Sequence, residues 1–510
     1  MGESCLRTRS DCSAGYRGKS ASIQRFFNQI EQGELPVHSL IVCHHGSTIA
    51  EFWREPYRKD CPQLLYSLSK SVTSIAVGIA WDMGFIRLDD LVISFFPERL
   101  PERVSDKLSA MTIHHLLSMT AGHEGDIYPV VAKEQDWVKA FLAQEVDHEP
   151  GTQFQYSTHS TYMLSAILER VTGQNLVDFL MPRLFEPLGI ARPVWETCPM
   201  GVTAGGMGLS LTTSDVAAFG QMLLNKGMFK GKRIVSEQYI QMATSEQSDN
   251  RKGTNRIDWA QGYGYQFHRC RDGCFRADGA FGQLCFVSPK DGIVIAVTAS
   301  YPTMDMLQTL LNLIYEHLLD EVDSSGDTRE HPHTDVQQEG HPLSIDFSSQ
   351  WPSVESWSWT VPLHREARHT VGGKHAQQVL ELPELHQHVY VMQPNASGLK
   401  QIRFDDQSET VQLYLLYGDE RDIAVPINAA QPMRTKAVFY KDLSMSLQEV
   451  VVYASWVSEC TLQAKLFYIE TPYVVTYIMK FQPQSIELEF AINVSFHLSN
   501  FIAVGYKESL

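Results

Sequence analysis

The stretch Tyr66-Ser67-Leu68-Ser69-Lys70-Ser71 places a hydroxyl and an amine three residues apart at the start of an apolar segment. On a helix, positions i and i+3 lie on the same face about one turn apart, so the Lys70 amine is expected to reach the Ser67 oxygen. A free serine hydroxyl is too weak a nucleophile to attack a carbonyl unless a base lies beside it. The pattern therefore predicts an activated serine, with Ser67 as nucleophile and Lys70 as its base.

The residues after Ser67 predict a buried helix. Apolar side chains cover nearly every face from Val72 to Met83, which is typical of a helix inside a protein, and Gly84 is expected to end it. The first turn of such a helix leaves N–H groups unpaired and carries the positive end of the helix dipole. This field favours an oxyanion and disfavours an ammonium, so we expect a lowered pKa for Lys70, the more so if it is buried.

Ser-x-x-Lys is a short pattern, and average composition gives about one or two chance matches in a chain of this length. A second match, Ser397-Gly398-Leu399-Lys400, lies in a turn flanked by Pro, Asn and Gly, with no apolar helix behind it. We expect this second match to have no function.

The order of segments around Ser67 resembles the serine β-lactamase and penicillin-binding-protein superfamily, in particular its class C-like esterase, amidase and D-aminopeptidase members. The resemblance covers roughly residues 13 to 320 of the chain. Beyond Ser67 and Lys70 it rests on five segments that occur in the family's order. These are Leu88-Asp89-Asp90, the run from Met111 to Gly122, the run from Pro150 to Ser157, the run Gly205-Gly206-Met207-Gly208-Leu209, and the run from Ala277 to Gln283.

The resemblance implies a second catalytic motif, Tyr-x-Asn, whose tyrosine helps to take and return the proton of the nucleophile. Tyr156-Ser157-Thr158 occupies that place. A tyrosine titrates near pH 10, so Tyr156 is expected to act as a base at neutral pH only where cations such as Lys70 hold its pKa down. Thr158 departs from the family's substrate-binding asparagine, since threonine is shorter and donates a single hydrogen bond.

The third motif of the family is a cationic residue or Trp, then any residue, then Gly, and here it reads Ala277-Asp278-Gly279. The missing cation makes a penicillin or cephalosporin a poor substrate candidate. Asp278 suggests instead a ligand with a positive group, and the equally weighted alternative is that Asp278 only turns the chain beside Gly279. The backbone N–H groups of Ser67 and Ala280 are implied as the oxyanion hole.

Predicted strands lie at both ends of this region, with predicted helices between them. The strands are expected at residues 39–43, 47–52, 263–268, 282–287 and 292–299, and the helices at 160–172, 214–225 and 304–319. Terminal strands that pair around a helical insertion predict an α/β (α+β) β-lactamase-like fold, with one antiparallel sheet and an active site where sheet and helices meet.

We expect two domains, in agreement with a length of 510 residues and a hydrophobic content of 44%. The predicted hydrolase domain covers residues 1–322, and a polar linker without apolar periodicity covers 323–342. Short alternating runs spaced by turn residues then predict an all-β domain over 343–510, either a lipocalin-like barrel or a sandwich. The role of this second domain and the oligomeric state are left open.

Charge and cysteine content narrow the partners and the compartment. The formal net charge of −17 argues against a nucleic-acid partner and against an anionic membrane surface. Nine cysteines without even spacing favour a reducing compartment, so we expect a cytoplasmic protein. Cys270 and Cys274 flank a predicted hairpin turn and match no zinc pattern, so neither a metal nor a cofactor is expected.

These observations predict a serine hydrolase that cleaves a small ester, amide or short peptide, including peptides with D-amino acids, through an acyl-enzyme on Ser67. Lys70 and Tyr156 are the predicted proton-transfer groups. Thr158, Asp278 and Gly279 are predicted to contact substrate. The alternative is a non-catalytic binding protein that has kept the fold, and a weaker alternative is a β-lactamase.

Overall fold

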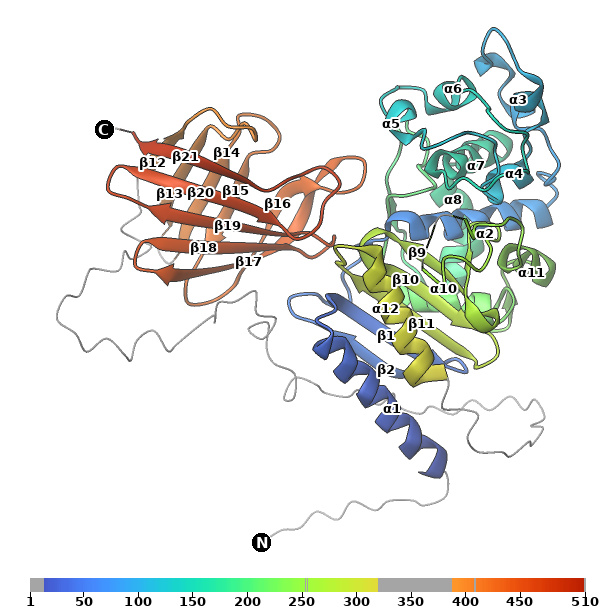
Figure 1. Cartoon of the computed structure of the whole chain (residues 1–510), viewed down its shortest axis with the longest axis horizontal. Coiled ribbons are helices and arrows are strands. Elements are labelled where there is room, and N and C mark those ends of the chain that lie inside the picture. Colours follow the sequence, from blue (N-terminus) through green and yellow to red (C-terminus); the bar gives the residue numbers. More distant parts are fainter. Residues whose placement is uncertain (1–12, 253, 255, 320–387, 408–409, 509–510) are drawn as a thin grey trace.

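The computed structural model describes residues 13–252, 254, 256–319, 388–407 and 410–508. These form a sheet-and-helix part, which ends at residue 319, and a β-barrel that begins near residue 388 (Figure 1). The predicted linker, 323–342, and the first part of the predicted β domain, 343–387, lie outside the described residues. Within the described part of the chain, no helix combines the length and the apolar character needed to cross a membrane.

Both ends of the first part contribute strands to one six-stranded antiparallel sheet. Its order is β2-β1-β11-β10-β9-β8, so the N-terminal hairpin pairs with the last strand, and Val42 lies opposite Ile295. This confirms the predicted antiparallel sheet around a helical insertion. The strands are β1 (Val37–His44), β2 (Ser47–Trp53), β8 (His268–Arg269), β9 (Phe275–Gly279), β10 (Gln283–Ser288) and β11 (Ile293–Ala299).

Helices cover both faces of this sheet. On one face α1 (Ser13–Gln32), α12 (Met304–Ile314) and the π-helical turn η7 (Tyr315–Leu319) share an apolar core with alternate residues of β10 and β11. On the other face α10 (Thr213–Leu224) packs against the same two strands, and α2 (Ser69–Asp82) belongs to the same core. Burial on both faces explains why every residue of β11 is buried and why the strand shows no polar alternation.

The insertion between β2 and β8 is largely helical (Figure 1). It contains α3 (Asp106–Ala110), α4 (Ile113–Leu117), α5 (Tyr128–Val131), α6 (Trp137–Leu142), α7 (Thr158–Thr172), α8 (Leu176–Leu180), α9 (Glu186–Leu188) and α11 (Glu237–Thr244). Shorter elements are η1 (Tyr66–Leu68), η2 (Val92–Phe95), η3 (Pro97–Arg99), η4 (Met181–Phe185), β3 (Gln63–Leu64), β4 (Val194–Trp195), β5 (Leu209–Leu211), β6 (Met228–Phe229) and β7 (Lys232–Arg233).

The strand predicted over residues 263–268 is wrong for most of its length, because the chain there turns toward the helical region. Only its last residue, His268, joins the sheet, and β8 pairs with β9 around the short turn η5 (Arg271–Gly273). Gln266 has a positive φ of 65°. Its side-chain amide donates to the carbonyl oxygens of Leu116 and Leu117 at 3.1 and 2.8 Å, and these bonds hold the segment away from a regular strand.

The C-terminal part is a nearly closed antiparallel barrel, one of the two predicted alternatives. Its strands follow the order β15-β14-β13-β12-β21-β20-β19-β18-β17-β16, and the two outer strands lie side by side. Buried and half-buried residues alternate along β14 and β18, as expected for strands with one face inside a barrel. The strands are β12 (Val389–Met392), β13 (Gln401–Gln407), β14 (Thr410–Leu416), β15 (Ile423–Ile427), β16 (Met433–Tyr440), β17 (Met445–Ser458), β18 (Thr461–Tyr468), β19 (Val474–Phe481), β20 (Ser485–Ile492) and β21 (Phe501–Lys507).

The barrel packs against the turn that carries Ser67. Leu64, Tyr66 and Phe281 of the first part belong to the apolar core of the barrel. The ring of Phe496, from the barrel, lies 6.0 Å from that of Tyr66 and 4.7 Å from that of Phe281, measured between centroids. Tyr66 directly precedes the predicted nucleophile, and Phe281 directly follows the predicted second oxyanion donor.

Buried hydrogen bonds accompany this apolar contact. The Tyr66 hydroxyl donates to the Tyr473 hydroxyl at 2.9 Å, and the latter donates to the Lys441 carbonyl at 3.2 Å. At the edge of the contact, Arg58 Nη2 donates to Glu449 Oε2 at 3.1 Å. Apolar and polar contacts thus join the two parts where the predicted nucleophile lies.

Replacing Tyr473 by Phe tests this connection. The change keeps the ring but leaves the Tyr66 donor and the Lys441 carbonyl without their partner, which costs about 1–3 kcal/mol of unfolding free energy. We expect a lower urea midpoint for Tyr473→Phe in circular dichroism. Tyr506→Phe is the matched control, since Tyr506 lies in the same barrel and is 52% exposed. Equal midpoints for the two variants would contradict the contribution of the Tyr66–Tyr473 bond.

Candidate active site

The Ser67 hydroxyl and the Lys70 amine lie together at the start of α2. Lys70 Nζ donates to Ser67 Oγ at 2.9 Å. It also donates to Thr158 Oγ1 at 3.2 Å and to the Gly206 carbonyl at 2.7 Å. Three acceptors match the three protons of an ammonium, so the lysine head group is held in one position.

The local fold explains why the lysine is buried. Tyr66–Leu68 form a 3₁₀ turn that continues directly into α2, and Tyr66 has a φ of 49°. All residues of α2 from Ser69 to Ala80 are buried, and Lys70 itself is 1% exposed. As expected from the sequence, α2 ends with Gly84 in a left-handed conformation just beyond it.

Burial lowers the pKa of Lys70 to about 7, although the nearby carboxylates of Asp442 and Asp278 act in the opposite direction. The direction is the one expected from the sequence. A substantial fraction of the amine is therefore neutral near pH 7 and able to accept a proton. The Ser67 hydroxyl, hydrogen-bonded to Lys70 Nζ, is placed to give it that proton.

The Tyr156 ring lies close to the Lys70 amine. Lys70 Nζ is 5.0 Å from the centroid of the Tyr156 ring, and the Tyr156 phenol and the Ser67 side chain share a hydrogen bond. Burial raises the pKa of Tyr156 above its usual range. The sequence analysis required a lowered pKa for Tyr156 to act as a base; the structure gives the opposite direction, which keeps the phenol protonated.

Thr158 and Gly206 complete the Lys70 environment. Thr158 is the first residue of α7, whose N-cap Ser157 accepts from the Ser160 N–H at 3.3 Å. At the position of the family's asparagine, the Thr158 hydroxyl thus contacts the lysine. A Cβ on Gly206 would lie 2.7 Å from the Thr158 carbonyl oxygen, so only glycine brings this backbone close enough.

The end of β9 lies directly against the nucleophile turn. A Cβ on Gly279 would meet the Leu65 carbonyl oxygen at 2.1 Å and the Leu68 nitrogen at 3.2 Å. The next turn, η6 (Ala280–Gly282), contains Phe281 with a φ of 61°. The backbones of Ser67 and Ala280 therefore lie on neighbouring segments, each next to a non-glycine residue with positive φ, a conformation found often at functional sites.

Asp278 is engaged with other protein groups. Its carboxylate accepts from Arg276 Nε at 2.7 Å, and His268 Nε2 lies 3.6 Å away. Burial opposes its charge, yet His268 and Arg276 hold the pKa of Asp278 below its usual range. Arg276 is a cation near the third motif that the sequence analysis overlooked, although side chains two residues apart on a strand share a face.

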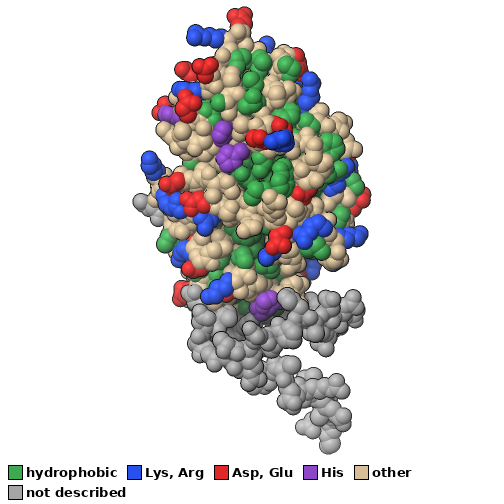
Figure 2. Space-filling view, turned by 90° about the vertical axis from the view of Figure 1, so that its right-hand side faces the viewer, with side chains coloured by type: hydrophobic (Ala, Val, Ile, Leu, Met, Phe, Trp, Pro, Cys, Tyr) green, Lys and Arg blue, Asp and Glu red, His purple; other side chains and the backbone are tan. Residues whose placement is uncertain are grey.

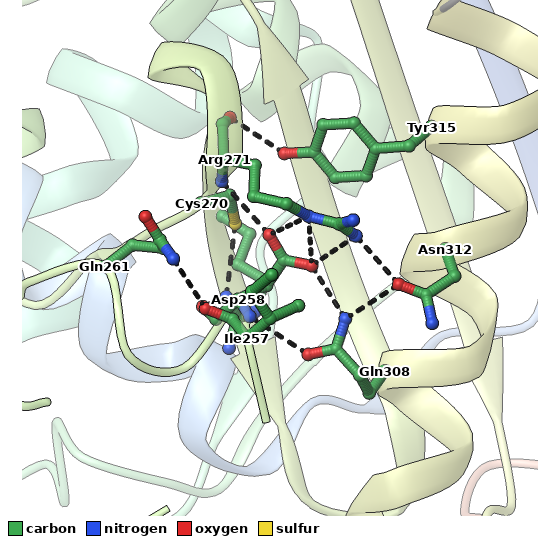
Figure 3. A network of polar contacts seen from close by, with 9 residues as sticks. Ile257, Asp258, Gln261, Cys270, Arg271, Gln308, Asn312 and Tyr315 are labelled. Atoms are coloured by element: carbon green, nitrogen blue, oxygen red, sulfur yellow. Dashed lines mark hydrogen bonds and ion pairs between the residues drawn. The ribbon is translucent and has the colours of Figure 1, made fainter. Parts of the chain in front are cut away.

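A buried polar network supports this wall of the site (Figure 3). Arg271, after β8, forms a two-pronged ion pair with the carboxylate of Asp258, which is fully buried. Gln308 and Asn312 on α12 tie the same groups to that helix. The network fixes the loop that carries Trp259, whose ring lies 6.1 Å from that of Tyr156.

The cysteines beside this network take part in ordinary packing and hydrogen bonding. Arg276 Nη1 donates to Cys270 Sγ at 3.1 Å. The hairpin predicted between Cys270 and Cys274 is present, with β8 paired to β9. Among the residues that the structure describes, no group of three or more His, Cys, Asp or Glu side chains is arranged to hold a metal ion.

The barrel brings a further carboxylate to the site. The tip of the β16–β17 hairpin, residues 441–444, lies at Glu196, which accepts from the backbone N–H groups of Asp442 and Ser444, both at 3.1 Å. Asp442 is close enough to influence the pKa of Lys70. The sequence analysis missed Asp442 and Glu196, since neither lies in a motif and they are far apart in the chain.

One face of the molecule carries mixed charge. On the face in Figure 2, basic and acidic side chains are interspersed among hydrophobic and neutral ones.

Comparison with known proteins identifies the family of this chain. The Beta-lactamase family model matches residues 23–314. The 6-aminohexanoate-dimer hydrolase of Paenarthrobacter ureafaciens is 26% identical over 288 residues, which are 52% of this chain and 73% of that protein. Penicillin-binding protein 4 of Amycolatopsis lactamdurans is 27% identical over 228 residues, 38% of this chain and 58% of the relative.

A solved structure, that of EstCE1, described as a hydrolase with promiscuous acyltransferase activity, has the same fold. It matches with a TM-score of 0.50 at 18% identity, covering 60% of this chain and 99% of that one. The family model spans more than half of the 510 residues and includes every predicted site residue from Ser67 to Ala280. The chain therefore belongs to the beta-lactamase family of serine hydrolases.

Proposed function

We propose that this protein hydrolyses a small ester, amide or short peptide through an acyl-enzyme on Ser67. The observation that carries the proposal is the hydrogen bond of 2.9 Å between Lys70 Nζ and Ser67 Oγ, made by a lysine that is 1% exposed. Burial lowers the pKa of this lysine to about 7. A neutral amine beside a serine is the arrangement that an activated nucleophile needs.

In the acylation step, Lys70 Nζ accepts the proton of Ser67 Oγ as that oxygen attacks the substrate carbonyl carbon. The carbonyl oxygen becomes an oxyanion, which the backbone N–H groups of Ser67 and Ala280 stabilise. Preorganised donors of this kind contribute about two to three decades in rate each. The strained neighbours Tyr66 and Phe281 hold the two segments in place.

Collapse of the tetrahedral intermediate breaks the bond to the leaving group, which needs a proton. Tyr156 keeps its phenolic proton at neutral pH and shares a hydrogen bond with Ser67, so it donates that proton and is restored from the Lys70 ammonium. In deacylation, water attacks the acyl carbon and gives its proton to the same pair of groups. The acid is released and Ser67 regains its hydroxyl.

The structure and the comparisons favour this function over the two alternatives. A binding protein has no use for a neutral lysine beside a serine, whereas a hydrolase requires one. A β-lactam carries a carboxylate, and the cation nearest the third motif, Arg276, is already paired with Asp278. The relative named for hydrolysis of a 6-aminohexanoate dimer supports an ester or amide substrate.

Ser67→Ala tests the nucleophile. We expect a fluorophosphonate to phosphonylate wild type once per chain, with loss of fluoride, and Ser67→Ala to stay unlabelled in intact-mass spectrometry. Turnover of p-nitrophenyl butyrate should fall by about three decades or more. Ser397→Ala is the control, because it removes the serine of the second Ser-x-x-Lys match. Labelling that persists in Ser67→Ala, or is lost only in Ser397→Ala, would contradict the assignment.

Lys70 predicts the pH dependence. Protonated Lys70 cannot take the Ser67 proton, so kcat/KM for a neutral ester should fall about tenfold per pH unit below a pKa of about 7 and be constant above it. Lys70→Arg should be inactive at all accessible pH values, since a guanidinium stays protonated. Lys400→Arg should behave as wild type. A rate that rises as the pH falls would contradict a basic role for Lys70.

Tyr156→Phe separates the two proton-transfer roles. If Tyr156 protonates the leaving group, the loss should depend on how much the leaving group needs a proton. We expect kcat/KM to fall by about 10²-fold or more for an amide, and by less than tenfold for a p-nitrophenyl ester, whose phenolate leaves without help. The two substrates measured on one variant control each other. Equal losses would argue that Tyr156 acts before the leaving group departs.

A further inference from the structure

The tip of the β16–β17 hairpin is fixed at the active site by a single carboxylate. Glu196, just after β4, accepts hydrogen bonds from the backbone N–H groups of Asp442, Leu443 and Ser444 and from the Ser444 hydroxyl, at 2.8–3.3 Å. The Leu443 side chain packs against the core of the hydrolase part. The hairpin is therefore held as a built part of the site.

The Asp442 side chain has one oxygen that accepts no hydrogen bond from the described residues. The Gly208 backbone N–H is near enough to the Asp442 carboxyl group to influence its pKa. One oxygen of that carboxyl group, Oδ2, is buried and has no hydrogen-bond partner among the described residues. A buried carboxylate oxygen without a donor is costly and calls for an explanation.

Within the described part of the chain, no cationic side chain is bonded to Asp442 Oδ2. The three donor directions of Lys70 Nζ point to Ser67, Thr158 and Gly206. The other carboxylates near the site are used, since Asp278 accepts from Arg276 and Glu196 holds the hairpin tip. Of these three carboxylates, Asp442 has a buried oxygen, Oδ2, that is available to accept a hydrogen bond from a substrate.

We propose that Asp442 is a specificity-determining residue, supplied by the barrel, that pairs with a positively charged group of the substrate. The group is an ammonium or another cation with N–H donors, placed within reach of Oδ2 while the scissile carbonyl lies at Ser67. This inference rests on the proposed hydrolase function and adds the charge of the substrate to it. It also moves the cation-binding role predicted for Asp278 to a different carboxylate.

Two neighbouring features support a cation at this position. Burial first, and the Glu196 charge second, raise the pKa of Asp442 to about 7, and a positive group beside Asp442 would favour its ionised form. Burial and then the Asp442 charge raise the pKa of Tyr128 to about 12, and the Tyr128 hydroxyl lies 3.9 Å from Met207 Sδ, in the segment that contains Gly206 and Gly208. A carboxylate beside an aromatic ring suits an ammonium.

The test compares charged and neutral substrates on wild type and Asp442→Asn. On the acyl side, glycyl, β-alanyl and 6-aminohexanoyl p-nitroanilides are each compared with their N-acetyl forms. On the leaving-group side, a 2-(trimethylammonio)ethyl ester is compared with its 3,3-dimethylbutyl analogue, and a 2-aminoethyl amide with its N-acetyl form. The ratio of kcat/KM for the charged substrate to kcat/KM for its neutral partner is measured at a pH where Lys70 is neutral. This pH is also below the pKa of the substrate's amine, so that the amine keeps its charge.

We expect wild type to prefer at least one charged substrate about tenfold or more over its neutral partner, as for a hydrogen bond between charged groups. Asp442→Asn, which keeps the shape, should reduce the charged-to-neutral ratio of kcat/KM to less than threefold. Glu487→Gln, an exposed ion-pair carboxylate of the same barrel, should keep the preference.

The outcomes separate this inference from the proposed function. Failure of wild type to react with the fluorophosphonate at Ser67 would remove the hydrolase proposal itself. Reaction at Ser67, with an Asp442→Asn ratio unchanged on both sides or with equal losses for charged and neutral partners, would overturn only the role of Asp442. The rate of Ser67 labelling by a neutral fluorophosphonate shows whether each variant keeps an intact site.

Discussion

The site is organised by the burial of one amine. In water, a lysine side chain is an ammonium at neutral pH. Lys70 lies at the start of α2 and is almost completely buried. Because burial disfavours the charged form, the charged and neutral forms have similar free energies near pH 7. Helix α2 must therefore be buried on all sides, and α7 and the Gly206 segment must approach it closely. The long insertion between β2 and β8 supplies both.

The backbone on either side of Ser67 and Ala280 is fixed by contacts with the barrel. Tyr66 and Phe281 both hold left-handed conformations that bulky residues rarely adopt, and such conformations persist when neighbouring structure fixes them. The barrel provides that fixation through Phe496 and the Tyr66–Tyr473 hydrogen bond. The barrel is thus a structural component of the site.

Local patterns predicted much of this arrangement. The spacing of Ser67 and Lys70, the apolar helix behind them and the terminal strands are readable because they depend on residues close in sequence or on regular periodicity. The strand predicted at 263–268 failed because Gln266 binds the helical region, a contact that periodicity does not encode. The roles of Asp442 and Glu196 could not be predicted for the same reason. Their contact joins two distant parts of the chain, and neither residue belongs to a recognisable motif.

The shared core of Leu64, Tyr66, Phe281 and barrel residues has a consequence for synthesis of the protein. Domains usually fold in order as the chain leaves the ribosome, and the segment around Tyr66 emerges long before its partner Tyr473, 407 positions later. During synthesis, the nucleophile turn therefore lacks its contacts with Tyr473 and Phe496 until the barrel has emerged.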